Sequence, residues 1–138
     1  EATLEKEWET LRRIGWLDLP QLRAAIRVSG INSLAMTKLD TLANIHPIKV
    51  CVAYRYQGKR LDVFPVSRRA QLDVEPVYQT FPGFSGDLSG AKRMSDLPVS
   101  ARGYVEQVER WLKVPVSIVS VGQSRDQTIV RDKRFIWA

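Results

Sequence analysis

Two short polar strings stand where predicted strands end, and their residue types are those that recognise a purine base. Thr37-Lys38-Leu39-Asp40 follows on a short apolar strand predicted over residues 33–37. A carboxylate held rigidly there can accept hydrogen bonds from N1–H and the exocyclic N2–H of guanine, while the Lys38 stem lies along the purine face. Adenine lacks that donor pair, so beside adenine the Asp40 carboxylate would stay desolvated and unpaired. The string predicts guanine recognition, although four such residues alone are more often a solvated lysine and a capping aspartate.

Two further candidates are weaker when each is taken alone. Ser120-Val121-Gly122 ends a second apolar strand, where Gly122 would let backbone amides approach a ligand and Ser120 could reach a purine edge or ribose. An ordinary turn explains the same string. Arg12 and Arg13 carry guanidinium forks suited to phosphate, but arginines at a helix end are more often solvated and compensate the helix dipole.

The elements that must position these strings alternate between helix and strand. Asp18 is a suitable N-cap, Pro20 falls in a first helical turn and Gly30 suits a helix end, so a helix is predicted between them. Other expected elements are a helix over 3–12, a hairpin of 48–56 and 59–64 about Gln57-Gly58, an edge strand over 74–81, an irregular segment over 82–98, a helix from Ser100 to before Pro115, and strands over 116–120 and 127–130.

This pattern predicts an α/β protein: a mixed sheet with flanking helices and an antiparallel hairpin, forming part of a larger α/β fold. In such sheets ligands bind beyond the carboxyl ends of the strands. The two polar strings are expected at that edge.

Composition narrows the classes of function. The 138 residues carry a formal charge of +6, which favours a polyanionic partner such as nucleotide, phosphate or nucleic acid. Neither a membrane span nor a secretory signal is visible, so a soluble, cytoplasmic protein is expected. The single His46 and single Cys51 provide neither a metal-ligand set nor a nucleophilic triad, and Gly86–Lys92 has the wrong spacing for a phosphate-binding loop. No catalytic or metal-binding residue is therefore assigned.

Several strings, in order and at the expected spacing, resemble one family, adenylosuccinate synthetase, in its carboxyl-terminal part. The resemblance covers about residues 12–130. The matching strings are Gly15-Trp16-Leu17-Asp18, Thr37-Lys38-Leu39-Asp40, Lys49-Val50-Cys51-Val52-Ala53-Tyr54, Glu75-Pro76-Val77-Tyr78, Pro82-Gly83 and Val114-Pro115-Val116-Ser117-Ile118-Val119-Ser120-Val121-Gly122.

The resemblance implies a GTP-dependent ligase that joins IMP and aspartate, with magnesium, in purine nucleotide synthesis. By position, Lys38 and Asp40 match the guanine-recognition pair, Ser120 and Gly122 a second guanine-side contact, and Arg12 an arginine of the GTP site. A homo-oligomer is expected, and the magnesium ligands, the phosphate loop and the catalytic Asp and His are expected outside these residues.

The chain also departs from the family. Thr10 stands where the family carries an arginine that contacts IMP, so residues 1–14 are predicted to form an atypical helical segment. Residues 15–130 form the expected synthetase-like domain and 131–138 a basic, aromatic tail. The leading hypothesis is a catalytically incomplete part of the synthetase that retains a guanine half-site. A stand-alone, non-enzymatic nucleotide-binding or interaction module is the alternative, and a nucleic-acid-binding domain ranks last because no exposed sheet interleaves aromatic and basic residues.

Overall fold

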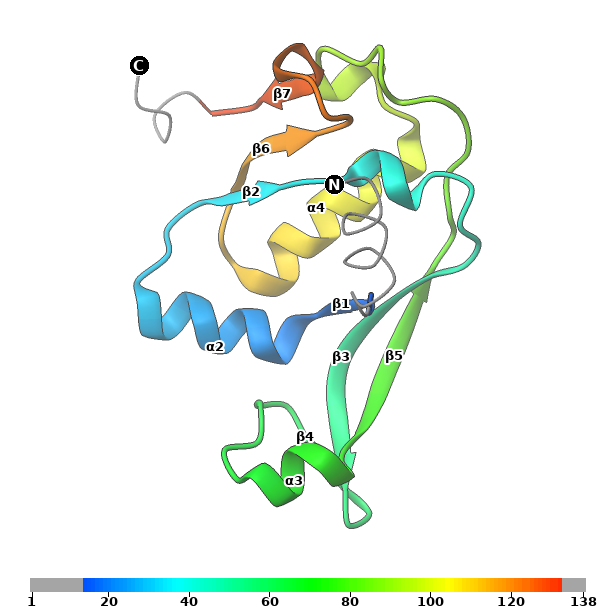
Figure 1. Ribbon diagram of the computed structural model, residues 1–138. Helices are drawn as coiled ribbons and strands as arrows, with labels where there is room; N and C mark the ends of the chain where they lie inside the picture. Colours follow the sequence, from blue (N-terminus) through cyan, green and yellow to red (C-terminus); the bar gives the residue numbers. More distant parts are fainter. Residues whose placement is uncertain (1–13, 133–138) are drawn as a thin grey trace, which may run out of the picture.

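The computed structural model describes residues 14–132, which form two small sheets with helices packed against them (Figure 1). In the first sheet, the long strand β3 (Ile48–Tyr56) pairs in parallel with β1 (Leu17–Asp18) and antiparallel with both β4 (Lys59–Leu61) and β5 (Glu75–Phe81). The mixed α/β class predicted from the sequence is confirmed.

The second sheet carries the predicted site strings. Its central strand β6 (Val116–Ser120) pairs in parallel with β2 (Leu34–Met36) and antiparallel with β7 (Thr128–Val130). Because β2 and β6 run in the same direction, both strands end at one edge of this sheet.

Three α-helices lie among the described residues, together with short 3-10 turns that include η1 (Leu39–Leu42), η2 (Met94–Asp96) and η3 (Arg125–Gln127). The helix α2 (Leu19–Ser29) begins as predicted, since the Asp18 carboxylate accepts a hydrogen bond from Gln21 N at 3.0 Å, and it ends at Gly30 with φ 62°. The other two helices are α3 (Arg68–Asp73) and α4 (Val99–Leu112).

One hydrophobic core joins both sheets to α2 and α4. The amphipathic face predicted for α4 is buried at Tyr104, Val105 and Val108, and Phe81 of β5 packs edge-on against the rings of Tyr104 and Trp111. Further side chains of this core are Leu19, Leu39, Ile48, Val50, Phe84, Leu88, Leu97, Leu112, Val116, Val119, Val121 and Ile129.

Residue Arg131, just after β7, ties the second sheet to α4. Its Nη1 donates to Glu109 Oε1 at 2.7 Å and to Val116 O at 2.8 Å, and the same Glu109 oxygen accepts from Val116 N at 2.7 Å. This network holds the beginning of β6 against the end of α4 and so helps to orient β6 in the sheet.

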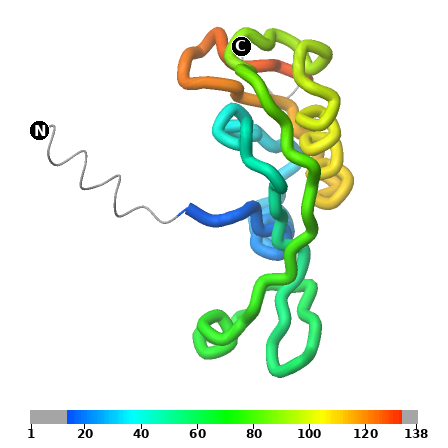
Figure 2. Tube along the Cα trace, turned by 90° about the vertical axis from the view of Figure 1, so that its right-hand side faces the viewer, coloured from blue at the N-terminus to red at the C-terminus, as the bar shows by residue number. Residues whose placement is uncertain are grey.

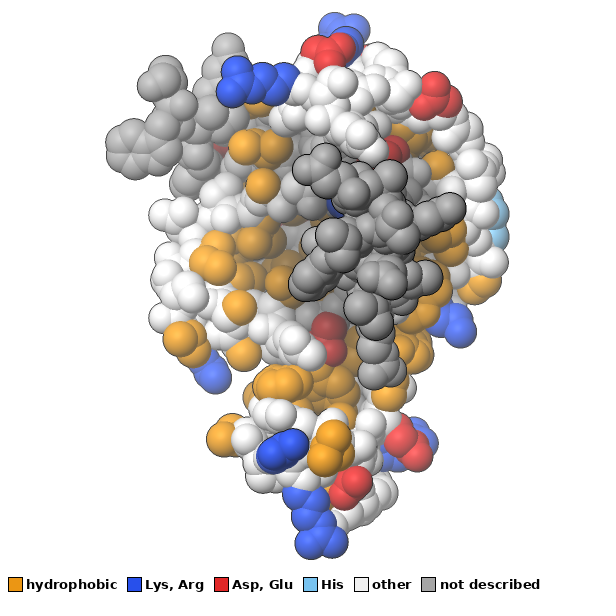
Figure 3. Space-filling model, viewed as in Figure 1, with side chains coloured by type: hydrophobic (Ala, Val, Ile, Leu, Met, Phe, Trp, Pro, Cys, Tyr) orange, Lys and Arg blue, Asp and Glu red, His pale blue; other side chains and the backbone are white. Residues whose placement is uncertain are grey.

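The far halves of β3 and β5 run side by side into an extension that carries β4 and α3 and projects from the body (Figures 1 and 2). Its Val66 and Leu72 are exposed. In Figure 3 several Lys and Arg side chains lie at this end, and others lie at the opposite end of the molecule.

Several sequence-based boundaries are wrong. The second strand of the hairpin ends at Leu61 rather than at residue 64, because Phe64 turns back to pack edge-on against Tyr54 at 6.1 Å between ring centroids. The segment over 82–98 is not wholly irregular, since it buries Phe84, Leu88 and Leu97 and includes η2. The helix α4 ends before Pro115, as predicted; it stops at Leu112, because Lys113 adopts a left-handed conformation.

The helix predicted over 3–12 lies outside the described residues. Among residues 14–132, no helix has the length and apolar character that crossing a membrane requires.

Candidate guanine-nucleotide site

The first candidate loop, residues 37–42, leaves β2 through a left-handed residue. Lys38 has φ 60° and ψ 37°, a conformation that costs a residue with a side chain about 1–2 kcal/mol. Thr41 holds this geometry, because its backbone N–H and its hydroxyl both donate to the carbonyl oxygen of Lys38, at 3.2 and 2.7 Å. Leu39 anchors the loop in the core with 1% of its surface exposed. The buried leucine therefore fixes the backbone from which Lys38 and Asp40 project.

Asp40 has a carboxylate oxygen without a hydrogen-bond partner. Its Oδ1 is closed off from solvent and no group of the described chain donates to it, although the residue as a whole is only half-buried. An unsatisfied buried acceptor lowers the stability of the fold by about 1–3 kcal/mol, so a hydrogen bond to this oxygen would be favourable. A bound group with N–H donors would reach this oxygen only after the side chain turns it toward the surface.

The second candidate loop, residues 120–127, satisfies its own polar groups. The Ser120 hydroxyl donates to Gly122 O at 2.8 Å, and Val121 N donates to Gln127 O at 2.9 Å. The Gln127 side chain folds under the loop and accepts from Ser124 N at 3.0 Å. A Cβ on Gly122 would lie 2.1 Å from Gln127 Oε1. This close approach gives Gly122 a structural reason to be glycine, in addition to the ligand contact predicted for it.

The two loops meet at one edge of the second sheet. Met36 at the end of β2 is opposite Val119 near the end of β6, and η1 contacts β6. The sequence predicts both loops at the carboxyl ends of strands, and the parallel pairing makes those strands neighbours. Arg12, the third predicted contact, lies outside the described residues.

A shallow hollow of about 260 Å³ opens beside the first loop. Trp16, Met36 and Ile48 give it an apolar wall, while Lys38 and Lys49 bring positive charge to its rim. Tyr104 from α4 also lines it, and burial raises the pKa of that phenol to about 12, so Tyr104 is neutral near pH 7. The hollow thus combines flat apolar surface with cations, a combination suited to a planar anionic ligand.

A second hollow, of about 650 Å³, lies over β1, β3 and β5 and includes polar residues that sequence reasoning assigned only to capping or strand roles. The Tyr54 hydroxyl donates to Asp18 Oδ2, and burial together with this bond raises the pKa of Tyr54 above its usual value. Burial, followed by the nearby Asp18 charge, also raises the pKa of the Cys51 thiol, which donates to Ala53 O. A thiol held protonated is a poor nucleophile, so Cys51 is structural here.

His46 also has a structural setting. Its Nε2 lies 3.1 Å from Ser85 Oγ, and a Cβ on Gly83 would lie 2.2 Å from both His46 Nδ1 and Ile45 O. The close approach explains the glycine of Pro82-Gly83. Across residues 14–132, no three His, Cys, Asp or Glu side chains gather in a group that could hold a metal ion.

These features define an α/β domain with candidate ligand loops at the ends of two adjacent parallel strands. The family model described as adenylosuccinate synthetase matches residues 7–129. The chain therefore belongs to the adenylosuccinate synthetase family.

Similar proteins agree over the same region. The adenylosuccinate synthetase of Bacillus licheniformis is 48% identical over 119 residues, which are 86% of this chain and 28% of that protein. That of Borrelia recurrentis is 45% identical over 124 residues, 90% of this chain and 29% of that protein. The solved structure of fully ligated adenylosuccinate synthetase from Plasmodium falciparum superposes with a TM-score of 0.81 at 33% identity, covering 86% of this chain and 29% of that one. The chain thus spans less than a third of the length of the relatives it matches.

Proposed function

We propose that these residues are the guanine-recognising part of an adenylosuccinate synthetase, the GTP-dependent ligase that joins IMP and aspartate. Family membership supports the ligase class, and the arrangement of the two strand-end loops supports the assignment of this region to the nucleotide base. We propose a homo-oligomeric, cytoplasmic enzyme on the same family grounds.

The single observation that carries the guanine assignment is the unpartnered Oδ1 of Asp40. In this proposal N1–H and N2–H of guanine donate to the two carboxylate oxygens once a small rotation of the side chain turns Oδ1 toward the ligand. The exposed Lys38 stem lies along the purine face. Ser120 has given its only hydroxyl hydrogen to Gly122 O, so it can meet the base only as an acceptor.

In this proposal the phosphate loop, the catalytic Asp and the catalytic His that the family resemblance implies lie outside these 138 residues. A phosphate-cradling glycine loop and an activating acid or base supply most of the stabilisation of such a transition state. We therefore propose that the 138-residue chain, purified alone, does not form adenylosuccinate from IMP, aspartate and GTP. Measurable turnover that co-elutes with the purified chain would contradict this.

A nucleotide titration followed by NMR tests the base assignment. GTP, GDP and GMP should shift the amide signals of Lys38, Asp40, Ser120 and Gly122, whereas ATP should not. We expect affinity of about millimolar, since two or three hydrogen bonds and one stacked face supply only about 4 kcal/mol against the cost of association. Equal responses to ATP and GTP, or shifts confined to other residues, would overturn guanine recognition and leave the likeness as one of fold.

A non-enzymatic nucleotide-binding or interaction module is a second candidate, because the described residues enclose a hydrophobic core of their own from Leu19 to Ile129. The two candidates differ in whether the chain works together with a second polypeptide that supplies the phosphate loop. If a companion polypeptide bearing the family's phosphate loop restores adenylosuccinate synthesis when mixed with it, the synthetase assignment holds. If binding of guanine nucleotide persists and no such companion restores activity, the module is favoured.

A further inference from the structure

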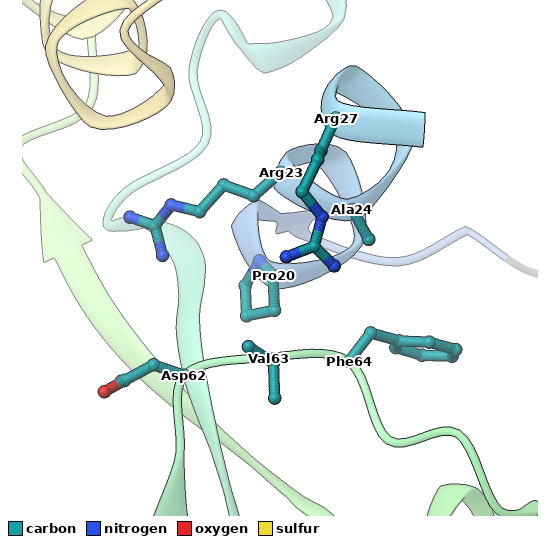
Figure 4. A pocket seen from close by; sticks show the side chains of 7 residues that line it. All are labelled: Pro20, Arg23, Ala24, Arg27, Asp62, Val63 and Phe64. Carbon is teal, nitrogen blue, oxygen red and sulfur yellow. The ribbon is translucent and has the colours of Figure 1, made fainter. Parts of the chain in front are cut away.

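A separate cavity of about 250 Å³ lies between α2 and the chain that follows β4 (Figure 4). It shares no lining residue with the two strand-end loops. Its lining is formed by Pro20, Arg23, Ala24, Arg27, Asp62 and Val63, together with Phe64.

Two arginines one helical turn apart supply the positive charge. In Figure 4 the Arg27 guanidinium hangs over Pro20 toward the chain at Val63 and Phe64, and it forms no hydrogen bond or ion pair with any residue of 14–132. Arg23 is held only through Nε, which donates to Trp111 O at a long 3.4 Å. The terminal nitrogens of both guanidinium groups therefore keep their donors available.

The nearest acidic side chain in the lining does not cancel this charge. Asp62 lies on the Arg23 side in Figure 4 and points away from Arg27. Its Oδ1 already accepts a hydrogen bond from Arg60 Nε at 2.9 Å, so the charge of Asp62 is balanced by Arg60. In Figure 4 the Arg23 guanidinium extends away from that of Arg27, so an anion beside Arg27 would contact that group directly, and the second positive charge on the same helix would add to the attraction.

The remaining lining is apolar. Pro20 and Ala24 form one wall and Val63 and Phe64 the other, so a ligand here would meet hydrocarbon as well as charge. The volume is smaller than the roughly 300–1,000 Å³ of pockets that hold drug-sized molecules. The cavity therefore suits a small anion with a short apolar group rather than a whole nucleotide.

We propose that this cavity binds a small organic oxyanion, a phosphate or carboxylate on a short apolar or aromatic stem. Arg27 is its principal ligand through a bidentate fork, Arg23 supplies the second positive charge, and the apolar walls hold the stem. The site is independent of the guanine loops, so it stands or falls separately from the proposed function.

Titration of the full chain with three probes tests the ligand class by NMR. The probes are inorganic phosphate, phenyl phosphate and benzoate, with the amides of α2 and of residues 62–64 as reporters. Phenyl phosphate should bind at least about fivefold more tightly than inorganic phosphate, because burying even part of a ring adds about 1 kcal/mol. A response to benzoate alone would assign the site to carboxylates, and a response to both organic probes would assign it to oxyanions in general. If inorganic phosphate binds as well as phenyl phosphate, the apolar walls hold nothing and the proposal is wrong.

Matched variants test the residues. Arg27→Gln should weaken phenyl phosphate about tenfold and Arg23→Gln less, since Arg23 is partly committed to Trp111. Arg69→Gln removes the same charge from α3, outside the cavity lining, and should change nothing. Val63→Ala trims an exposed wall and should reduce only the preference for phenyl phosphate over phosphate. Equal weakening by Arg27→Gln and Arg69→Gln would show that net charge alone attracts the anion, and would overturn the site.

Discussion

The two strand-end loops share an edge of one sheet, yet they treat their polar groups in opposite ways. The loop after β2 holds Lys38 in a left-handed conformation and leaves Asp40 Oδ1 without a donor. In the loop after β6, the Ser120 hydroxyl, the Val121 N–H and the Gln127 side chain all form hydrogen bonds within the loop.

The loop after β2 has a polar group free for a ligand, whereas the loop after β6 has its polar groups already bonded within the protein. Unsatisfied acceptors and backbone strain destabilise the unliganded fold, and they are found at sites where bonds to a ligand offset that destabilisation. A loop that already satisfies its polar groups has less to gain from a ligand and more to lose from mutation. We therefore expect substitutions of the polar side chains of the first loop to change binding, and substitutions in the second loop to change folding. Leu39 is the exception in the first loop, because its side chain belongs to the core.

The largest effect should come from the one side chain of the first loop that belongs to the core. Leu39→Ala should lower the free energy of unfolding by about 2–5 kcal/mol, because Leu39 is almost completely buried and its loss leaves a cavity. Urea denaturation measures this. Val28→Ala, on the exposed side of α2, is the control and should stay within about 0.5 kcal/mol of the unmodified chain. A small effect at Leu39 would mean that the loop is not anchored by the core.

Asp40→Asn should remove the preference for guanine while leaving the fold intact. The amide keeps the shape but offers a donor where guanine also has donors, so the loss should be about 1.5–3 kcal/mol, or roughly 10- to 100-fold in the GTP-to-ATP affinity ratio. NMR titration of both nucleotides checks this ratio. Asp73→Asn, in the exposed end of α3, removes the same charge and should leave the ratio unchanged. If Asp40→Asn retains the preference, the base is read elsewhere.

Gly122→Ala should act on stability, by about 1–3 kcal/mol, because the new methyl group must displace the Gln127 side chain that caps Ser124 N. A double-mutant cycle with Gln127→Ala measures the coupling. In the Gln127→Ala background the alanine at position 122 should cost clearly less, since the obstructing side chain has gone. Additive costs would show that Gly122 is needed for another reason, such as the ligand contact predicted from the sequence.

The smallest effect has the opposite sign. Lys38→Gly should raise the free energy of unfolding by about 0.5–1 kcal/mol, because glycine adopts φ 60° without the steric cost that lysine bears. The same change should weaken guanine nucleotides by removing the stem over the purine. Lys113→Gly relieves a similar strain at the end of α4, φ 56°, and should stabilise the chain without changing nucleotide binding. Destabilisation by Lys38→Gly would indicate that the lysine stem packs in the unliganded protein.

Local features of the fold were accessible from the sequence because they depend on neighbouring residues. Asp18 and Gly30 set the two ends of α2, and Gln57 and Gly58, both with positive φ, form the turn predicted between β3 and β4. The end of β4 was not accessible, since the Phe64 ring leaves the strand to meet Tyr54, a contact between segments that periodicity does not encode.

By itself, the sequence determined the class of fold, the family and the two polar strings that follow strands. Their residue types and positions are properties of the chain, and they survive whatever the strands pair with. Only the tertiary structure decided that β2 and β6 are parallel neighbours, that Asp40 keeps an unpaired oxygen, and that Gln127 closes the loop beside Gly122. The physical reason is that hydrogen-bond satisfaction depends on which groups are brought together by packing, and residues far apart in the chain make those contacts.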